Sequence, residues 1–176
     1  MPITVMKPAP PFDEEAYVRG NASPTRVRLA DYAGRWVVLF FYPRDFSFVC
    51  PTEIQAFAGL HDQFERERAI VLGASTDSYY CHKAWFETDK RLADVKYPVI
   101  ADTAHRLSAD YGVLLENGDA LRGTFIIDPD GILRHALLND VDVGRNVEET
   151  LRTLKALRTG DRCPASWTPG EETLGH

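Results

Sequence analysis

The stretch at residues 36–53 reads WVVLFFYPRDFSFVCPTE. Its first seven residues form an unbroken apolar and aromatic run that Pro43 ends. Such a run, rich in β-branched and aromatic residues, is typical of a strand buried on both faces of a sheet. Beyond the loop at 43–49, apolar residues recur at positions 54, 57, 60 or 61, and 64, which is the spacing of one helical stripe. The stretch therefore predicts a buried strand, a loop and a helix, with Cys50 where the helix begins.

The alternation of strands and helices continues along the chain. The expected strands are at 69–75, 97–101 and 124–128, and the expected helices are at 81–92, at 103–111 and from the cap Asn146 to Gly160. The DPDG sequence at 128–131 predicts a turn, so 132–138 is expected to return as an antiparallel strand. Residues 1–25 hold five prolines and are expected to form loops and short edge strands. The pattern predicts an α/β fold in which helices cover both faces of a mixed central sheet.

The composition is that of a domain that can fold without disulfide bonds. The chain has 176 residues, 44% of them hydrophobic, which is enough to bury a full core. We expect one domain at 1–160 and a C-terminal tail at 161–176. The three cysteines, Cys50, Cys81 and Cys163, are therefore free for chemistry. Because three cysteines cannot all pair within one chain, a reducing compartment would keep them as thiols outside a redox cycle.

Charge and hydropathy argue against two classes of partner. With 20 basic and 26 acidic residues the net charge is −6, and no basic block occurs, so nucleic acid is not an expected partner. No apolar run approaches the roughly 18 residues that cross a bilayer, and the first residues lack a signal-peptide pattern. We expect a soluble cytoplasmic protein without a membrane partner. Neither glycine-rich phosphate-binding pattern occurs, so no nucleotide or other cofactor is expected.

Cys50 is the first candidate for reactivity. It lies directly before Pro51 and close to Glu53, and both residue types favour the first turn of a helix. Free N–H groups and the dipole at a helix start favour a thiolate over a thiol. The alternative is a small buried hydrophobe among aromatic neighbours, and position alone does not separate the two. Ser47, three residues earlier, either offers a hydroxyl to the sulfur or caps the helix, and the two roles are compatible.

These residues resemble the active-site segment of the peroxiredoxins. The matching segments are 41–53 (FYPRDFSFVCPTE), 75–78 (STDS), 82–85 (HKAW), 122–128 (RGTFIID), 144–145 (GR) and 163–167 (CPASW). The resemblance covers nearly the whole chain and is closest to the typical two-cysteine branch, which includes the C subunit of bacterial alkyl hydroperoxide reductase. It implies a thioredoxin-like fold and a thiol peroxidase that reduces hydrogen peroxide and organic hydroperoxides. It also implies a homodimer that often closes into a ring of five dimers.

The resemblance assigns roles to single residues. Cys50 resembles the peroxidatic cysteine, and Pro43 resembles the proline that shields it from water. Ser47 stands at the hydroxyl position, Arg122 matches the cation brought to the sulfur, and Glu53 matches an acid that orients this arginine. From the residues alone, Arg122 would be interpreted as a solvated surface charge. We expect Ser47, Arg122 and backbone N–H groups to stabilise the charge that develops on the leaving peroxide oxygen.

Cys163 resembles the resolving cysteine of the same family. The resemblance implies a disulfide with Cys50 of the partner subunit, which a thioredoxin-like or flavoprotein disulfide reductase then reduces. The segment around Cys163 contains Pro164, Pro169 and Gly170, so it cannot continue a helix and should move easily. We also expect the helix start at Cys50 to unwind after oxidation, so that another thiol can reach it. The alternative is a tail cysteine without a role.

Several features depart from the family pattern. Ser47 stands where threonine is commoner, and the stretch at 155–162 is shorter than in many relatives. The Gly-Gly-Leu-Gly segment and the Tyr-Phe end of relatives prone to overoxidation are absent from 87–98 and from the end of the chain. We therefore expect resistance to overoxidation.

Three alternatives remain open. A metal site at Cys81 and His82 would need about four donors, and no C-x-x-C spacing is present, so a spare thiol or core residue is favoured there. A thioredoxin-like disulfide reductase usually carries C-x-x-C at its helix start, which this chain lacks. A ring-forming holdase or a peroxide sensor would use the cysteines as a switch, and peroxide turnover with a reductant separates it from an enzyme.

Overall fold

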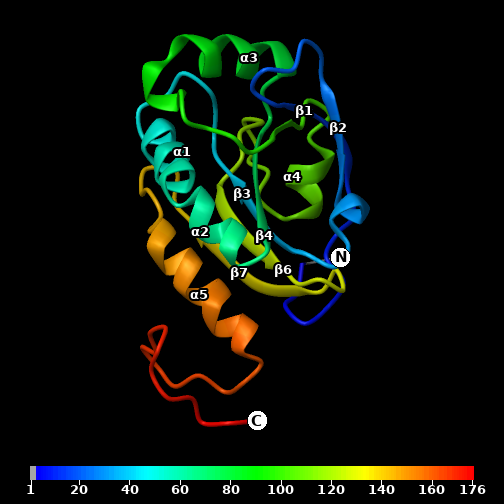
Figure 1. The fold of residues 1–176 in the computed structure, drawn as a ribbon. Helices are drawn as coiled ribbons and strands as arrows, with labels where there is room; N and C mark the ends of the chain where they lie inside the picture. The colour runs from blue at the N-terminus through cyan, green and yellow to red at the C-terminus, as the bar shows by residue number, and fades with distance from the viewer. Residues whose placement is uncertain (1–2) are drawn as a thin grey trace.

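A seven-stranded mixed sheet with helices on both faces forms the centre of the molecule (Figure 1). The computed structural model describes residues 3–176, so the expectations for residues 1–2 lie outside it. The strands are β1 (Asp13–Tyr17), β2 (Thr25–Arg28), β3 (Trp36–Phe41), β4 (Ala69–Ser75), β5 (Val99–Ala101), β6 (Arg122–Ile127) and β7 (Leu133–Asn139). Their order is β2-β1-β5-β4-β3-β6-β7. The pairs β3/β4 and β4/β5 are parallel and the others antiparallel, which confirms the predicted mixed sheet.

The helices divide unequally between the two faces. They are α1 (Cys50–Gly59), α2 (His61–Arg66), α3 (Tyr79–Thr88), α4 (Arg106–Asp110) and α5 (Val147–Thr159), with short 3-10 helices η1 (Leu29–Tyr32) and η2 (Lys90–Leu92). Buried side chains of α1, α2, α3 and α5 pack on one face of the sheet. Those of α4 and the N-terminal segment pack on the other. The strand predicted from the opening stretch, β3, lies inside the sheet between β4 and β6 and is buried along almost its whole length.

Local signals in the sequence form as predicted at two places. In the turn after β6, Gly131 adopts a φ of +78° and its N–H donates to the Asp128 carbonyl at 2.9 Å. At the start of α5, the Asn146 side chain accepts from the Glu149 N–H at 3.0 Å. The same helix ends at Gly160, which has a left-handed conformation.

Two predicted helices are each broken into two elements. The apolar stripe after Cys50 was expected on one helix, but α1 ends at Gly59 and α2 begins at His61, because Leu60 leaves helical geometry after a glycine of low helix propensity. The stretch 81–92 contains α3 and the separate η2. Asp89 between them is extended, and its carboxylate accepts from the Arg91 N–H at 3.0 Å.

Other bounds differ by one to three residues. β5 begins at Val99 rather than at 97, α4 begins at Arg106 rather than at 103, and β6 begins at Arg122 rather than at 124. The segment 161–176 contains no helix, as predicted, and lies beyond the end of α5 (Figure 1). It folds back on itself, with hydrogen bonds of 2.9 and 2.8 Å joining Arg162 to Gly175 and Leu174.

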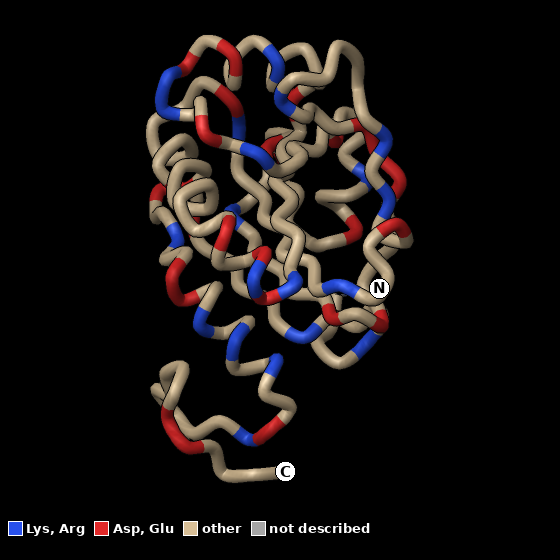
Figure 2. Tube along the Cα trace, viewed as in Figure 1, with Lys and Arg blue, Asp and Glu red and all other residues tan. Residues whose placement is uncertain are grey.

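Basic and acidic residues alternate over the elements from residue 3 to residue 176 (Figure 2). Within these residues, no helix is both long enough and apolar enough to cross a membrane.

Candidate active site

Cys50 is the first residue of α1 and is fully buried. Val49 precedes it as the cap, and Pro51 occupies the first turn, where its missing N–H costs no helix hydrogen bond. The prediction that Cys50 lies at a helix start is confirmed. Both readings of the residue hold at once: it is buried among apolar side chains, and its sulfur also faces a charged group.

That charged group is Arg122, the first residue of β6. Its Nη1 donates to the Cys50 Sγ at 3.4 Å, and its Nε donates to the Val141 carbonyl at 2.7 Å. The same Nη1 lies 2.6 Å from Glu53 Oε2, one turn further along α1. Strand β6 therefore brings a guanidinium to the sulfur across 72 residues of sequence, and Glu53 fixes its position.

A second arginine completes this buried network. Arg145 donates from its backbone N and from Nε to Glu53 Oε1, both at 2.8 Å. Its Nη1 donates to the Gly123 carbonyl at 2.7 Å and its Nη2 to the Phe41 carbonyl at 2.5 Å. Arg145 thus ties α1 to the ends of β3 and β6. Arg145 lies in one of the segments that resemble the family, but the resemblance assigns no role to it.

The buried charges of this network do not cancel. The side chains of Arg122, Arg145 and Glu53 are at most 3% exposed. Two buried guanidiniums and one carboxylate leave one uncompensated positive charge, and uncompensated buried charge is costly. The net charge of the network beside the Cys50 sulfur is therefore positive.

The sulfur lies at the base of a pocket of about 270 Å³, which we call the Cys50 pocket. Four of the predicted site residues, Pro43, Ser47, Cys50 and Arg122, line it together. Glu53 stands behind the pocket and holds Arg122. The other lining residues are Arg44, Phe48, Val49, Leu115, Asn117, Asp119, Val141 and Asp142.

Ser47 does not cap α1. Its hydroxyl donates to the Arg44 carbonyl at 3.0 Å within the loop before the helix, and the cap position belongs to Val49. The alternative role as a helix cap is therefore wrong, because two residues separate Ser47 from the first helical turn. Ser47 still lines the Cys50 pocket, but its hydroxyl donates to the Arg44 carbonyl and not to the Cys50 sulfur.

A buried polar network holds the loop that precedes Cys50. Asp45 accepts from the Tyr42 hydroxyl at 2.7 Å and lies 2.7 Å from His82 Nδ1, and both side chains of the Asp45 and His82 pair are fully buried. The Asp45 N–H donates to Asp77 at 2.8 Å. Sequence reasoning missed this pair, because nothing in the pattern links residues 37 positions apart.

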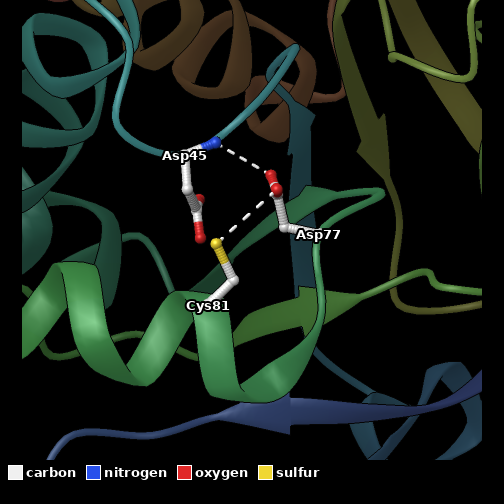
Figure 3. A group of neighbouring side chains, drawn as sticks. All are labelled: Asp45, Asp77 and Cys81. Atoms are coloured by element: carbon white, nitrogen blue, oxygen red, sulfur yellow. Dashed lines mark hydrogen bonds between the residues drawn. The ribbon is translucent and has the colours of Figure 1, made fainter.

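Cys81 belongs to the edge of the same network (Figure 3). Its thiol donates to Asp77 Oδ1 at 3.7 Å, from the first turn of α3. Burial, followed by the charges of Asp45 and Asp77, raises the pKa of Cys81 to about 12. The ligand atoms of these three residues lie within 4.8 Å of one another, as a metal site requires. Each carboxylate already accepts hydrogen bonds from protein donors, so the cluster has a structural explanation as the anchor of the loop.

Cys163 lies at the other end of the sheet. Its Sγ is half-buried, 3.7 Å from the Ala156 carbonyl and 3.6 Å from the Thr159 hydroxyl. It lines a pocket of about 620 Å³ together with Trp36, at the start of β3, and Arg134, near the start of β7. The structure does not bring the two predicted redox cysteines of one chain together.

Comparison with known proteins places this geometry in a family. Residues 5–136 match the model of the AhpC/TSA family. The putative peroxiredoxin YkuU of Bacillus subtilis is 49% identical over 97% of this chain and 97% of its own length. Peroxiredoxin-1 of Gallus gallus is 47% identical over 96% of this chain and 88% of its own.

Solved structures agree with these sequence matches. Reduced Plasmodium vivax 2-Cys peroxiredoxin superposes with a TM-score of 0.92 at 39% identity, over 98% of this chain and 93% of that one. Mycobacterium tuberculosis AhpC superposes with a TM-score of 0.86 at 36% identity, over 95% of this chain and 99% of that one. The seven-stranded mixed sheet is thus the thioredoxin-like fold of these proteins. The chain belongs to the AhpC/TSA family and is a peroxiredoxin, a thiol peroxidase.

Proposed function

We propose that Cys50 is the nucleophile that reduces hydrogen peroxide and organic hydroperoxides, with Arg122 as its cationic partner. The observation that carries this proposal is the buried charge sum of Arg122, Arg145 and Glu53, which a Cys50 thiolate neutralises. The thiolate attacks one peroxide oxygen, the O–O bond breaks, and Cys50 becomes a sulfenic acid. The other oxygen leaves as hydroxide or alkoxide and takes a proton from solvent, which gives water or an alcohol.

The residues around the sulfur have distinct parts in this step. The Arg122 guanidinium stays charged at any working pH and offers several donors, so it stabilises charge on the leaving oxygen. Ser47 supplies a hydroxyl at the pocket wall, and Pro43 shields the sulfur from water. Glu53 positions Arg122 from behind, as the distance of 2.6 Å supports.

We further propose that Cys163 of the partner subunit resolves the sulfenic acid. A disulfide needs Cα atoms within about 7 Å of each other. Within one chain, β7 runs from the Cys163 end, where Arg134 lines that pocket, to Asn139, which pairs with Arg122 beside Cys50. Its seven residues span roughly 20 Å. An intrachain disulfide would therefore require a large displacement.

The free edge of the sheet supplies a route between subunits. β7 is an edge strand, and Leu137 and Leu138 on it are 36% and 50% exposed. If two copies pair antiparallel along β7, the Cys163 end of each lies at the Cys50 end of the other. This symmetric dimer buries the exposed leucines and places the redox cysteines in trans.

We also propose that dimers of this chain close into the ring that the resemblance implies. Tyr80 on α3 is 76% exposed and is available for such a contact. We propose a thioredoxin-like or flavoprotein disulfide reductase as the source of electrons, and a cytoplasmic location where such reductants keep the three free thiols reduced. In this scheme residues 1–160 are the catalytic domain and 161–176 are the tail that carries Cys163.

The test is oxidation of the reduced protein with one equivalent of peroxide, followed by intact mass and a non-reducing gel. The wild type is expected to give a covalent dimer through Cys50 and Cys163. Cys163→Ser is expected to stop at the sulfenic acid, and Cys81→Ser serves as the matched control that still forms the dimer. A covalent dimer in Cys163→Ser would contradict the assignment of the resolving residue, and an unoxidised Cys50 in the wild type would contradict the proposed nucleophile.

A further inference from the structure

The loop at 43–49 covers Cys50 and is held from two sides. On the α3 side, Asp45 is fixed by the buried network with Tyr42, His82 and Asp77. On the pocket side, Arg44 forms an ion pair with Asp119, in the turn between α4 and β6. Within residues 3–176, no other side-chain hydrogen bond or ion pair links the loop to the turn at 115–120.

The segment that follows these anchors, residues 46–48, has few contacts besides the packing of the Phe46 ring on Trp85. Phe46 has a φ of +54°, an uncommon conformation for a residue other than glycine, and is 61% exposed. Phe48 is 92% exposed. The hydroxyl of Ser47 bonds only within the loop. Segments with few buried contacts open at low free energy, so the anchors decide how often this one opens.

Hydrogen bonds within the turn hold the Asp119 carboxylate in place. Asp119 is 18% exposed, and its carboxylate also accepts from the Asn117 amide at 3.0 Å. The Asn117 carbonyl oxygen accepts in return from the Asp119 N–H at 3.1 Å. The turn therefore presents a fixed carboxylate to Arg44 at the mouth of the Cys50 pocket.

We infer that Arg44 and Asp119 are positioning residues that latch the Cys50 loop closed and thereby set the rate of the second half-reaction. This inference rests on the proposed function, in which Cys163 of the partner subunit condenses with the sulfenic acid. In that step the S–O bond of Cys50 breaks and an S–S bond forms. The hydroxyl leaves with the thiol proton as water, so no further oxidant or reductant is needed.

A closed latch slows disulfide formation and favours overoxidation of Cys50 to the sulfinic acid. Cys50 is fully buried, so Cys163 cannot reach it until the loop opens. A second peroxide enters through the pocket while the loop is closed and converts the sulfenic acid to a sulfinic acid. Weakening the latch is therefore expected to favour the disulfide and to reduce overoxidation.

The charge of Arg44 must be separated from its latching role. Arg44 has a raised pKa, first because of its hydrogen bond with Asp119 and, as a smaller cause, because of the charge of Cys50. Removing Arg44 therefore also removes a cation near the thiolate. Removing the charge of Asp119 leaves that cation in place. Loss of Arg44 and loss of the Asp119 charge are therefore expected to differ in their effect on peroxide attack and to agree in their effect on disulfide formation.

The experiment compares the full-length reduced wild type with Arg44→Gln and Asp119→Asn. Trp85 reports opening by its fluorescence, since its ring centroid lies 5.7 Å from that of Phe46. Rapid quenching with an alkylating agent and intact mass measure the rate of disulfide formation and the sulfinic fraction at excess peroxide. Because the pair is partly exposed, both variants are expected to form the disulfide about two- to fivefold faster. Peroxide attack is expected to slow more in Arg44→Gln than in Asp119→Asn, because only Arg44→Gln removes the cation.

Two further variants sharpen the test. The exchanged pair Arg44→Asp with Asp119→Arg restores opposite charges and is expected to return disulfide formation toward the wild-type rate. Arg26→Gln, on β2, breaks an exposed ion pair with Asp13 on β1 and is the matched control. Equal disulfide rates in all variants would overturn the latch alone, and so would opposite changes in Arg44→Gln and Asp119→Asn. Absence of any disulfide in the wild type would overturn the proposed function and the latch with it.

Discussion

The contact between Arg122 and Cys50 allows a quantitative prediction for Arg122→Met. At the observed 3.4 Å, with an effective dielectric constant of about 20, unit charges attract by about 5 kcal/mol. Glu53 offsets part of this attraction, because its carboxylate lies 2.6 Å from the same Nη1. We take about half of this attraction, ~2–3 kcal/mol, as the rise in the activation free energy of peroxide attack when Arg122 is lost. This rise slows peroxide attack about 30- to 150-fold.

The assay is stopped-flow oxidation of the reduced variant at fixed pH, with the second-order rate constant as the readout. Methionine has a similar length, and Glu53 keeps its contacts with Arg145, so the fold should persist, as circular dichroism would verify. Arg122→Lys retains the charge but loses the planar fork, so an intermediate rate is expected. Arg26→Met, far from the pocket, controls for the loss of an arginine. An Arg122→Met rate within twofold of the wild type would refute the electrostatic reasoning.

Two other predictions concern the thiol of α3 and the core beneath α1. Because the pKa of Cys81 is raised to about 12, Cys81 stays protonated below pH 9, and iodoacetamide is expected to label it slowly there and faster as pH rises toward 12. The pKa of Cys81 in the folded state lies above its value in the unfolded state, so its contribution to stability is complete below about pH 9 and is lost as pH rises toward 12. Rapid labelling of Cys81 at pH 7, located by peptide mass, would contradict the raised pKa. Phe57 is fully buried and stacks on Phe40 with centroids 4.1 Å apart, so Phe57→Ala is expected to lower the free energy of unfolding by about 3–5 kcal/mol in urea titration, and a loss below about 1 kcal/mol would contradict the packing.

Short-range patterns predicted the elements that carry the reactive cysteine. The apolar run before Pro43 could only be buried as a strand, and β3 is the fifth strand of seven in the sheet order. Cys50 followed by Pro51 identified a helix start because proline restricts the backbone of its own position. These signals involve only a few neighbouring residues, so they can be interpreted without knowledge of the tertiary structure.

The partners of that cysteine could not be predicted in the same way. Arg122 and Arg145 lie 72 and 95 residues after Cys50, and an isolated arginine is most often a surface charge. The resemblance identified Arg122, but only folding shows that one carboxylate, Glu53, organises both guanidiniums. Asp45 and His82 were missed for the same reason, because a buried polar pair produces no repeating pattern in the sequence. The break at Leu60 was missed because the apolar spacing at 54, 57 and 64 fits either one helix or two.

Under the proposed function, the active site must satisfy two requirements that conflict. Peroxide attack needs Cys50 buried beside Arg122, where low dielectric strengthens the stabilisation of the leaving oxygen. Condensation with Cys163 needs the same sulfur exposed, because the two cysteines lie at opposite ends of β7. One rigid loop cannot meet both requirements. The proposed latch resolves this conflict through two kinds of anchor. The buried Asp45 network fixes where the loop returns, and the partly exposed Arg44–Asp119 pair is expected to be weak enough to break in every cycle.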